Sequence, residues 1–230
     1  MSGKIAVVIL AAGKGTRLKM DIPKPLAPLH NKVLLDYVLE SVKTIGDTFL
    51  ITGHQNEMVE EHVNSTWPNL NKSYILQKEQ LGTGHAVKTY FEGNPKADDY
   101  EYTLVMCADT PLITSEILEE LKSEISAGID AVAATFMKSR PFGYGRIVRN
   151  SGGDILEIVE EKDASDEIRK IQEINTGIVA AKGANLKRWL SKLSNDNAQK
   201  EYYLTDCVAH AVAEGANITS VDCADPNEIQ

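Results

Sequence analysis

The chain has 230 residues, 43% of them apolar and 25% charged, and its formal net charge at pH 7 is −9. These values are typical of a globular chain with one large domain, or two small ones. The acidic balance argues against general nucleic-acid binding. No run of 18 apolar residues occurs, so no membrane-spanning helix is expected. Cys107, Cys207 and Cys223 lack metal-type spacing, and we expect a reduced, cytoplasmic setting.

A glycine-containing loop follows the first apolar segment. Residues 5–10 have the length and β-branched content of a buried strand. The loop after them reads Leu10-Ala11-Ala12-Gly13-Lys14-Gly15-Thr16-Arg17. Its small residues allow backbone N–H groups to approach an anion closely. The first 30 residues also hold five basic side chains and one acidic one. This pattern favours a seat for the phosphates of a small nucleotide.

Two well-known phosphate loops do not fit this segment. A P-loop requires Ser or Thr after Gly-Lys, and Gly15 stands there; a dinucleotide fingerprint requires a third glycine where Leu18 stands. An ordinary strand-to-helix turn remains the alternative. The cations Lys14, Arg17 and Lys24 favour phosphate binding over that alternative.

Strand and helix patterns alternate along the first 137 residues. In chain order, strands are predicted at 5–10, 48–52, 73–77, 102–107 and 130–137, and helices at 33–45, 55–63, 86–93 and 115–127. This alternation predicts an α/β fold: a doubly wound, mostly parallel (Rossmann-like) sheet with helices on both faces. Ligands of such sheets bind beyond the carboxyl ends of the strands.

The pattern changes from residue 140. Residues 145–149 and 155–160 flank a glycine-containing turn and predict a β-hairpin. A short helix or mobile flap is expected at 161–170, a strand at 174–181, helices at 185–192 and 204–214, and a last strand at 218–221. We therefore expect a single domain, residues 1–230, with the hairpin region inserted over the site.

Candidate ligand-binding residues follow several of the predicted strands. Asp109 could hold Mg²⁺ opposite a phosphate loop, or it could simply form a turn. Gln77, with the Gly82-Thr83 turn, could read a base edge; the alternative for Gln77 is a solvated strand end. Glu160 and Asn175 could bind sugar hydroxyls, although Glu160 stands in a charge run typical of a solvated face.

The histidines and serines suggest no other chemistry. The five histidines are scattered without metal-type spacing, and each is expected to be a surface residue or an internally bonded one. No Gly-x-Ser-x-Gly elbow or Ser-His-Asp arrangement occurs, which argues against acyl-transfer hydrolysis.

Several motifs together carry a family resemblance. The first loop with Pro23-Lys24 resembles the signature of sugar-phosphate nucleotidyltransferases. The complete set resembles the uridylyltransferase domain of the GlmU-type N-acetylglucosamine-1-phosphate uridylyltransferases. Its further members are Gln80-Leu81-Gly82-Thr83-Gly84-His85-Ala86, Asp109-Thr110-Pro111-Leu112-Ile113, Gly143-Tyr144-Gly145-Arg146-Ile147, Glu173-Ile174-Asn175-Thr176-Gly177 and Glu201-Tyr202-Tyr203-Leu204-Thr205-Asp206.

The resemblance implies a role for each matching position. Arg17 and Lys24 would hold phosphates and stabilise the leaving pyrophosphate, and Asp109 would bind Mg²⁺. The remaining substrate contacts would come from Leu10, Ala11, Ala12 and Gly13 to the nucleotide, from Gln77, Gly82 and Thr83 to uracil, and from Gly145, Glu160 and Asn175 to N-acetylglucosamine.

Two features of the family pattern are not found in this sequence. The asparagine that is the family's second metal ligand would follow Gln230, and no hexapeptide-repeat acetyltransferase domain is recognisable. We therefore expect no acetyl transfer and a monomer, and metal affinity and turnover could both be lowered.

The activity implied by the resemblance is transfer of uridylyl from UTP to N-acetylglucosamine 1-phosphate. The products would be pyrophosphate and UDP-N-acetylglucosamine, a peptidoglycan precursor. The alternatives are another nucleotidyltransferase of the same fold, using CTP, GTP or a different acceptor phosphate, and a nucleotide-sugar-binding module with little turnover.

Overall fold

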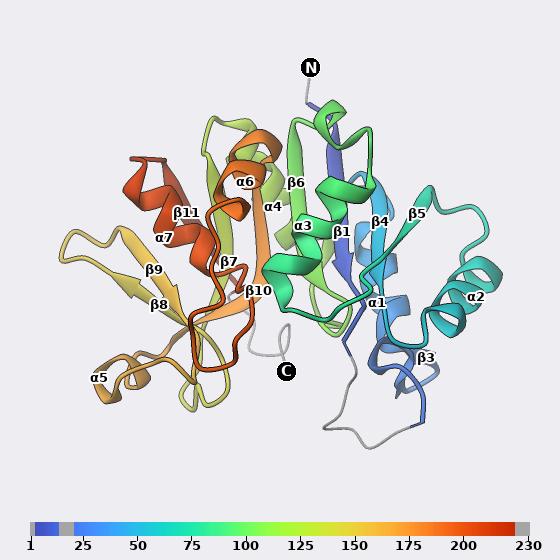
Figure 1. Cartoon of the computed structure of the whole chain (residues 1–230), viewed down its shortest axis with the longest axis horizontal. Helices are drawn as coiled ribbons and strands as arrows, with labels where there is room; N and C mark the ends of the chain where they lie inside the picture. Colours follow the sequence, from blue (N-terminus) through green and yellow to red (C-terminus); the bar gives the residue numbers. More distant parts are fainter. Residues whose placement is uncertain (1–2, 14–20, 224–230) are drawn as a thin grey trace.

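A nine-stranded mixed sheet forms the centre of the molecule (Figure 1). The computed structural model describes residues 3–13 and 21–223. Along its main path the strand order is β11-β7-β10-β6-β1-β4-β5. These strands are β1 (Ile5–Leu10), β4 (Asp47–Thr52), β5 (Lys72–Leu76), β6 (Tyr102–Cys107), β7 (Ala131–Met137), β10 (Glu173–Lys182) and β11 (Ile218–Asp222).

The apolar strand β1 lies in the middle of this sheet. It pairs in parallel with β4 on one side and with β6 on the other. Leu10 therefore lies between Ile51 and Cys107 in register. Since β5 also runs parallel to β4, the carboxyl ends of four strands meet at one edge, as the alternating pattern predicts.

The second half of the sheet differs from a simple parallel arrangement. Strand β10 is inserted between β6 and β7 and runs antiparallel to both, whereas β11 is parallel to β7. No crossover helix precedes β10; the chain reaches it from a hairpin through a short helical turn, and a parallel connection needs a longer crossover. A bulge between Asn175 and Val179 interrupts its pairing with β7.

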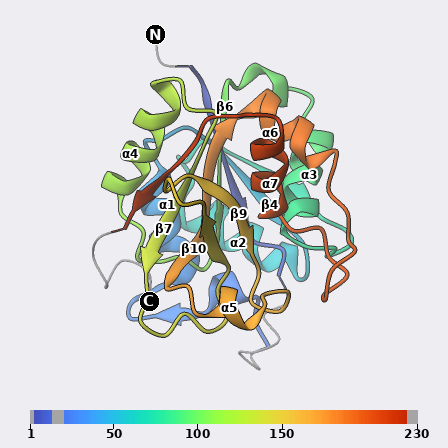
Figure 2. The ribbon, with the colours of Figure 1, turned by 90° about the vertical axis from the view of Figure 1, so that its left-hand side faces the viewer.

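Helices cover both faces of the sheet, as predicted (Figure 2). Alternate residues of β1 contribute to two separate apolar clusters, with Val7 in one and Val8 in the other, because successive side chains of a strand point to opposite faces. The first cluster includes residues of α1 (Leu34–Val42), α2 (Asn56–Thr66) and α4 (Ser115–Ser126), and the second includes residues of α3 (Thr83–Gly93), α6 (Gly183–Leu190) and α7 (Asp206–Ala213).

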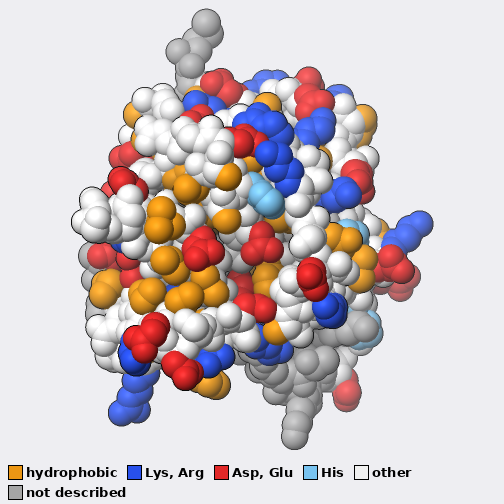
Figure 3. Space-filling view, turned by 60° about the vertical axis from the view of Figure 1, so that its left-hand side comes forward, with side chains coloured by type: hydrophobic (Ala, Val, Ile, Leu, Met, Phe, Trp, Pro, Cys, Tyr) orange, Lys and Arg blue, Asp and Glu red, His pale blue; other side chains and the backbone are white. Residues whose placement is uncertain are grey.

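The predicted hairpin is β8 (Arg146–Arg149) with β9 (Ile155–Val159), followed by the four-residue helix α5 (Asp166–Arg169). It joins the sheet through the pair of Arg146 and Ile174 in β10. Figure 3 brings this side of the molecule forward and shows acidic side chains set among apolar ones. Leu156, on the outer face of β9, is 38% exposed.

Short elements and helix boundaries account for the remaining differences. The sequence patterns did not predict η1 (Lys24–Leu26), η2 (Ala97–Asp99) or the two-residue strands β2 (Pro28–Leu29) and β3 (Lys32–Val33). Helix α3 begins at Thr83 rather than Ala86, so it includes Gly84, a residue that sequence reasoning treats as a helix breaker. No helix within the described ranges has the length and apolarity that a bilayer crossing requires.

Candidate active site

The loop after β1 is fixed at the carboxyl edge by its two neighbouring strands. The Ala11 amide donates to the Ile51 carbonyl at 2.9 Å, and the Ala108 amide donates to the Leu10 carbonyl at 3.1 Å. Ala11 and Ala12 are buried, whereas Gly13 is exposed. Arg17 and Lys14, which the sequence analysis singled out, lie outside the described residues.

Gly53 is a packing residue that was not among the predicted site residues. A Cβ atom at this position would lie 2.7 Å from the Ala12 Cβ and 2.9 Å from the Ala12 carbonyl oxygen. The absence of a side chain therefore lets the loop after β1 rest on the end of β4. A glycine directly after a buried strand was the signal that could have identified it.

Lys24 and Asp109 form an ion pair at the same edge. The ammonium contacts Asp109 Oδ2, and the two side chains are 40% and 30% exposed. Pro23 and Pro25 flank Lys24 where η1 begins, and proline fixes the local backbone angle. The proposed phosphate cation and the proposed metal ligand therefore lie in direct contact, although 85 positions separate them in the chain.

Gln77 and Gly82 meet at the end of β5. The Gln77 Nε2 donates to His85 Nδ1 at 2.8 Å and lies 3.4 Å from the Gly82 carbonyl oxygen. Gln77 is only 3% exposed, so the alternative of a solvated strand end is wrong. The bond to Gln77 agrees with the expectation that His85 is internally bonded.

The Gly82-Thr83 turn is clasped by a segment far along the chain. The Gly84 amide donates to the Tyr202 carbonyl and the Tyr202 amide to the Leu81 carbonyl, both at 2.8 Å. The Leu204 amide donates to Thr83 Oγ1 at 3.1 Å. Residues 201–205, here called the clasp segment, therefore hold the turn from one side.

The three residues expected at the sugar come together from three elements. Gly145 precedes β8, Glu160 follows β9 and Asn175 lies in β10. A Cβ atom at Gly145 would lie 3.6 Å from the Asn175 Cβ and 3.7 Å from Glu160 Oε1. The Asn175 amide also donates to the Gly145 carbonyl at 2.9 Å. Sequence reasoning alone favoured a solvated face for Glu160, and the structure contradicts it.

The environment of Glu160 is largely buried and acidic. Burial raises the pKa of its carboxyl above the ordinary value of 4.5, the hydrogen bond from Thr205 lowers it, and nearby Asp206 and Asp163 raise it further. The Thr205 hydroxyl donates to Glu160 Oε1 at 3.0 Å. The clasp segment therefore contacts Glu160 as well as the Gly82-Thr83 turn. Gly145, Glu160 and Asn175 are here called the sugar-side cluster.

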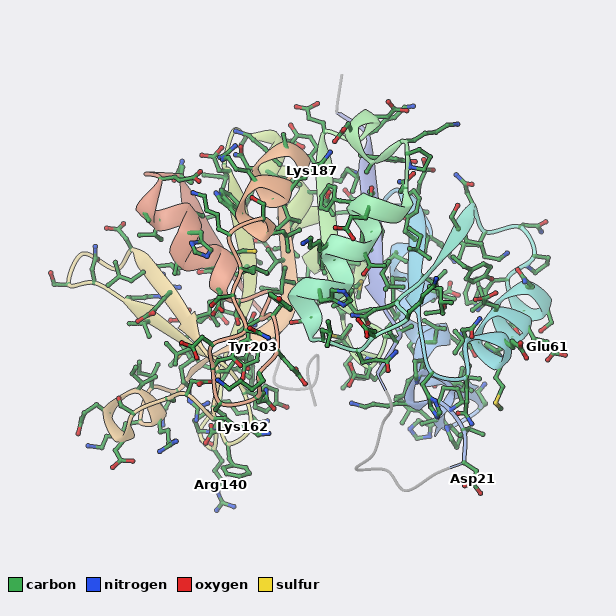
Figure 4. All side chains as sticks on the ribbon, viewed as in Figure 1. Asp21, Glu61, Arg140, Lys162, Lys187 and Tyr203 are labelled. Atoms are coloured by element: carbon green, nitrogen blue, oxygen red, sulfur yellow. The ribbon has the colours of Figure 1, made fainter. Side chains whose placement is uncertain are left out.

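Tyr203 extends the same connection. Its hydroxyl donates to Asp163 Oδ2 at 3.1 Å, and the Ala198 amide donates to Asp163 Oδ1 at 2.9 Å. In Figure 4, Tyr203 and Lys162 lie close together, on the two segments that these bonds join. Asp163 and Thr205 were not among the predicted site residues. Their bonds to Tyr203 and Glu160 join residues 40 or more positions apart, and no local sequence pattern indicates such a contact.

Cys107 is the last residue of β6, opposite the part of β10 that holds Gly177. Burial and the charges of Asp109 and Glu160 raise the pKa of its thiol, and Lys24 lowers it, with a result of about 12. The antiparallel pairing of β10 with β6 brings the segment that holds Asn175 beside the strand end that precedes Asp109. A Cβ at Gly177, whose φ is +83°, would lie 3.6 Å from the Cys107 sulfur.

The acidic residues suit a magnesium site with one protein carboxylate and phosphate ligands better than a site made entirely of protein ligands. Within residues 3–13 and 21–223, no cluster of three or more His, Cys, Asp or Glu side chains is arranged for a metal ion. Magnesium is commonly bound by one or two carboxylates together with phosphate oxygens. Asp109, already paired with a cation, offers such a carboxylate.

Comparison with solved structures identifies the fold. A structure of a UDP-glucose pyrophosphorylase complexed with UDP-glucose matches with a TM-score of 0.79 and 21% identity, covering 95% of this chain and 90% of the other. A Bacillus anthracis structure assigned as a glucose-1-phosphate thymidylyltransferase, in complex with sucrose, matches with a TM-score of 0.76 and 17% identity, covering 96% and 87%.

Sequence comparison narrows the relationship. The chain is 41% identical over 232 aligned residues to the bifunctional protein GlmU of Psychrobacter cryohalolentis and, equally, to that of Psychrobacter arcticus. Each alignment covers all of this chain and 50% of the relative, so the chain spans about half the length of these curated proteins. A family model for the MobA-like NTP transferase domain matches residues 7–182. The chain therefore belongs to the MobA-like NTP transferase family of nucleotidyltransferases.

Proposed function

We propose that the chain transfers the uridylyl group of UTP to N-acetylglucosamine 1-phosphate, releasing pyrophosphate and UDP-N-acetylglucosamine. The observation that carries the proposal is the meeting of Gly145, Glu160 and Asn175 on and around β10, which pairs with β6, the strand that Asp109 follows. A sugar phosphate bound there would have its phosphate directed toward Lys24 and Asp109. The identity to GlmU proteins over the full chain supports the choice of substrates.

The chain's own residues supply binding and charge rather than acid–base chemistry. Leu10 to Gly13 would contact the nucleotide through their backbone, and Gln77, Gly82 and Thr83 would select uracil. Lys24 and Arg17 would bind phosphate oxygens. The acceptor phosphate is already ionised, so no general base is required, and rate acceleration comes from positioning and from charge neutralisation at the α-phosphate.

Asp109 would hold magnesium, which supplies positive charge to the triphosphate when bound. Lys24 would then contact phosphate oxygens instead of the Asp109 carboxylate. Its position in η1, between two prolines, keeps its ammonium within reach of the carboxyl edge in either case.

Pyrophosphate release tests the proposal directly. The purified chain is assayed with UTP, CTP, GTP and ATP, each against N-acetylglucosamine 1-phosphate, glucose 1-phosphate and an alcohol phosphate, with and without magnesium. We expect UTP with N-acetylglucosamine 1-phosphate to exceed every other pair in kcat/KM by about 10²-fold or more, because a wrong ligand leaves polar groups of the site unpaired.

Other outcomes contradict the proposal in different ways. Turnover with CTP or GTP but not UTP would overturn the choice of nucleotide. Preference for another acceptor would overturn the choice of sugar. Thermal stabilisation by UDP-N-acetylglucosamine without magnesium-dependent turnover would identify a nucleotide-sugar-binding module instead.

A further inference from the structure

Arg146 is the most deeply buried charged side chain near the sugar-side cluster. It is 2% exposed, and its guanidinium forms four hydrogen bonds or ion pairs that span three segments. Burying an arginine is unfavourable unless its charge and its donors are matched. Its planar guanidinium presents five donors in a rigid fork, so it can fix the segments that supply the acceptors.

Each partner of Arg146 lies close in sequence to one of the sugar-side residues. One nitrogen donates to the carbonyl of Tyr144, the residue before Gly145. Another pairs with Glu161 Oε2 at 2.7 Å, directly after Glu160. The Nε donates at 3.0 Å to the carbonyl of Ile171, four positions before Asn175, and a further contact reaches Arg169.

The neighbouring carboxylates Glu160 and Glu161 are directed to different partners. Glu161 pairs with Arg146 and also accepts a 3.2 Å bond from the Gly143 amide. Glu160 instead accepts from Thr205 and lies near Gly145. The Arg146–Glu161 pair thus fixes which of two adjacent carboxylates is available to the site.

We propose that Arg146 is a positioning residue that sets the mutual geometry of Gly145, Glu160 and Asn175, and so determines affinity for the acceptor sugar phosphate without touching it. The identity of that ligand rests on the proposed function. Misplacement of a positioned group by about 1 Å can cost about 10²-fold. The partners of Arg146 adjoin the residues proposed to bind the sugar and not those proposed to bind the nucleotide, so we expect the effect on the sugar phosphate and not on UTP.

Arg149 provides a matched control on the same strand. It pairs with Glu173 through bonds of 2.6 and 2.8 Å and also donates to Gly153 and Ser220. It is therefore an equally well-bonded, partly buried arginine; its partners are Glu173 at the start of β10, Gly153 in the hairpin turn and Ser220 in the edge strand β11, and none of them adjoins Gly145 or Glu160 in the chain. Arg149→Lys removes the same chemical groups at the end of β8 that is remote from Gly145.

The experiment compares Arg146→Lys with Arg149→Lys. We expect Arg146→Lys to raise KM for N-acetylglucosamine 1-phosphate by about tenfold or more, with KM for UTP within about twofold of the parent. Arg149→Lys should change neither KM. Hydrogen exchange provides a readout that needs no substrate: amides at 143–145, 160–161 and 175 should exchange faster in Arg146→Lys only.

Glu161→Gln covers the case in which Arg146→Lys does not fold. It keeps an acceptor for the Gly143 amide but removes the charge that pairs with Arg146, so the same selective rise in KM is expected; Glu173→Gln is its control. Unchanged exchange at the named amides overturns the positioning role. Faster exchange without a selective rise in KM would show that Arg146 does not determine affinity for the sugar phosphate. A parent chain that does not use the sugar phosphate overturns the proposed function instead, while the exchange data still decide the positioning role.

Discussion

The ion pair of Lys24 and Asp109 joins the two described side chains that are proposed to act on the substrate phosphates. Both side chains are partly exposed, and exposed ion pairs contribute at most about 1 kcal/mol to folding. The pair is therefore expected to contribute more to ligand binding than to stability.

Asp109→Asn tests this separation of roles. We expect magnesium-dependent pyrophosphate release to fall about 10²- to 10³-fold, because a preorganised charge is lost at the reacting phosphate. The free energy of unfolding, measured in urea, should change by less than about 1 kcal/mol. Asp154→Asn, in the exposed hairpin turn, is the control and should retain activity. Activity of Asp109→Asn within a few-fold of the parent would exclude a metal role.

Glu160 differs from Asp109, because the environment of its carboxylate lowers the free energy of unfolding at neutral pH. Its folded-state pKa lies above the ordinary 4.5, so the ionised form is disfavoured by folding. The penalty is complete above the folded pKa and declines as pH falls toward 4.5, where the folded state takes up the proton first.

Glu160→Gln should therefore be more stable than the parent at pH 7.5, by about 1.4 kcal/mol for each unit of pKa elevation, while binding the sugar phosphate more weakly. The gain should shrink as pH falls toward 4.5. Urea unfolding at several pH values measures it, with Glu120→Gln on the exposed face of α4 as the control. A parent chain that is the more stable of the two at pH 7.5 would refute the assignment.

Among the elements, the Gly82-Thr83 turn packs closely against a segment that is distant in sequence. Gly82 has a φ of +108°, and a Cβ there would lie 2.5 Å from the Tyr202 carbonyl oxygen. Gly128, which follows α4, has nearly the same φ, +109°, but nothing lies within 4 Å of its Cβ position. Both glycines therefore have a positive φ, but a side chain at Gly82 would also collide with the clasp segment.

Gly128→Ala should cost about 1–2 kcal/mol of stability, the penalty of a left-handed backbone for alanine. Gly82→Ala should cost more, about 3 kcal/mol in total with the steric displacement of residue 202, and should raise KM for UTP. Urea unfolding and steady-state kinetics measure both. Equal destabilisation of the two variants would show that the clasp does not constrain the turn.

Periodicity and loop chemistry predicted most of the elements. The run of apolar residues at 5–10 and the alternation up to Met137 identified the parallel half of the sheet, because buried parallel strands and amphipathic helices leave local signals. The antiparallel direction of β10 left no local signal in the sequence, because the direction of a strand depends on the connection through which the chain reaches the sheet. At the site, Asp109 and the loop after β1 followed from position. Glu160 was misread because its hydrogen bond comes from Thr205, which is distant in sequence.

At the scale of the whole molecule, acid sensitivity comes from carboxylates that join elements. Asp36 in α1 is 5% exposed and accepts bonds from Trp67 Nε1 at 2.8 Å and His62 Nε2 at 2.9 Å. Although burial raises its pKa, these bonds and one from the Val33 amide bring the pKa below 3.8. Bonds from Arg188 and Lys192 similarly lower the pKa of Glu214 to about 2.

A carboxyl whose folded pKa is depressed stabilises the fold above its unfolded pKa and loses this contribution as pH falls. We therefore expect stability to decline from about pH 4.5 toward pH 2, the interval set by Asp36 and Glu214. Asp36→Asn should cost about 2–3 kcal/mol at pH 7, because buried donors lose a charged acceptor, and the difference should narrow below pH 3. Circular dichroism during acid titration measures it, with exposed Asp98→Asn as the control. An Asp36→Asn variant as stable as the parent would contradict this account.

The clasp segment has a thermodynamic consequence for the affinities of the two proposed subsites. Five consecutive residues hold Thr83 on one side and Glu160 on the other. Any ligand that orders one end reduces the conformational entropy still to be lost at the other, which is positive linkage without a change of shape. Linkage is reciprocal, so a ligand on the Thr83 side should tighten binding on the Glu160 side by the same factor that the second ligand tightens the first. The five residues of the clasp segment would then couple the ligand affinities of the two proposed subsites.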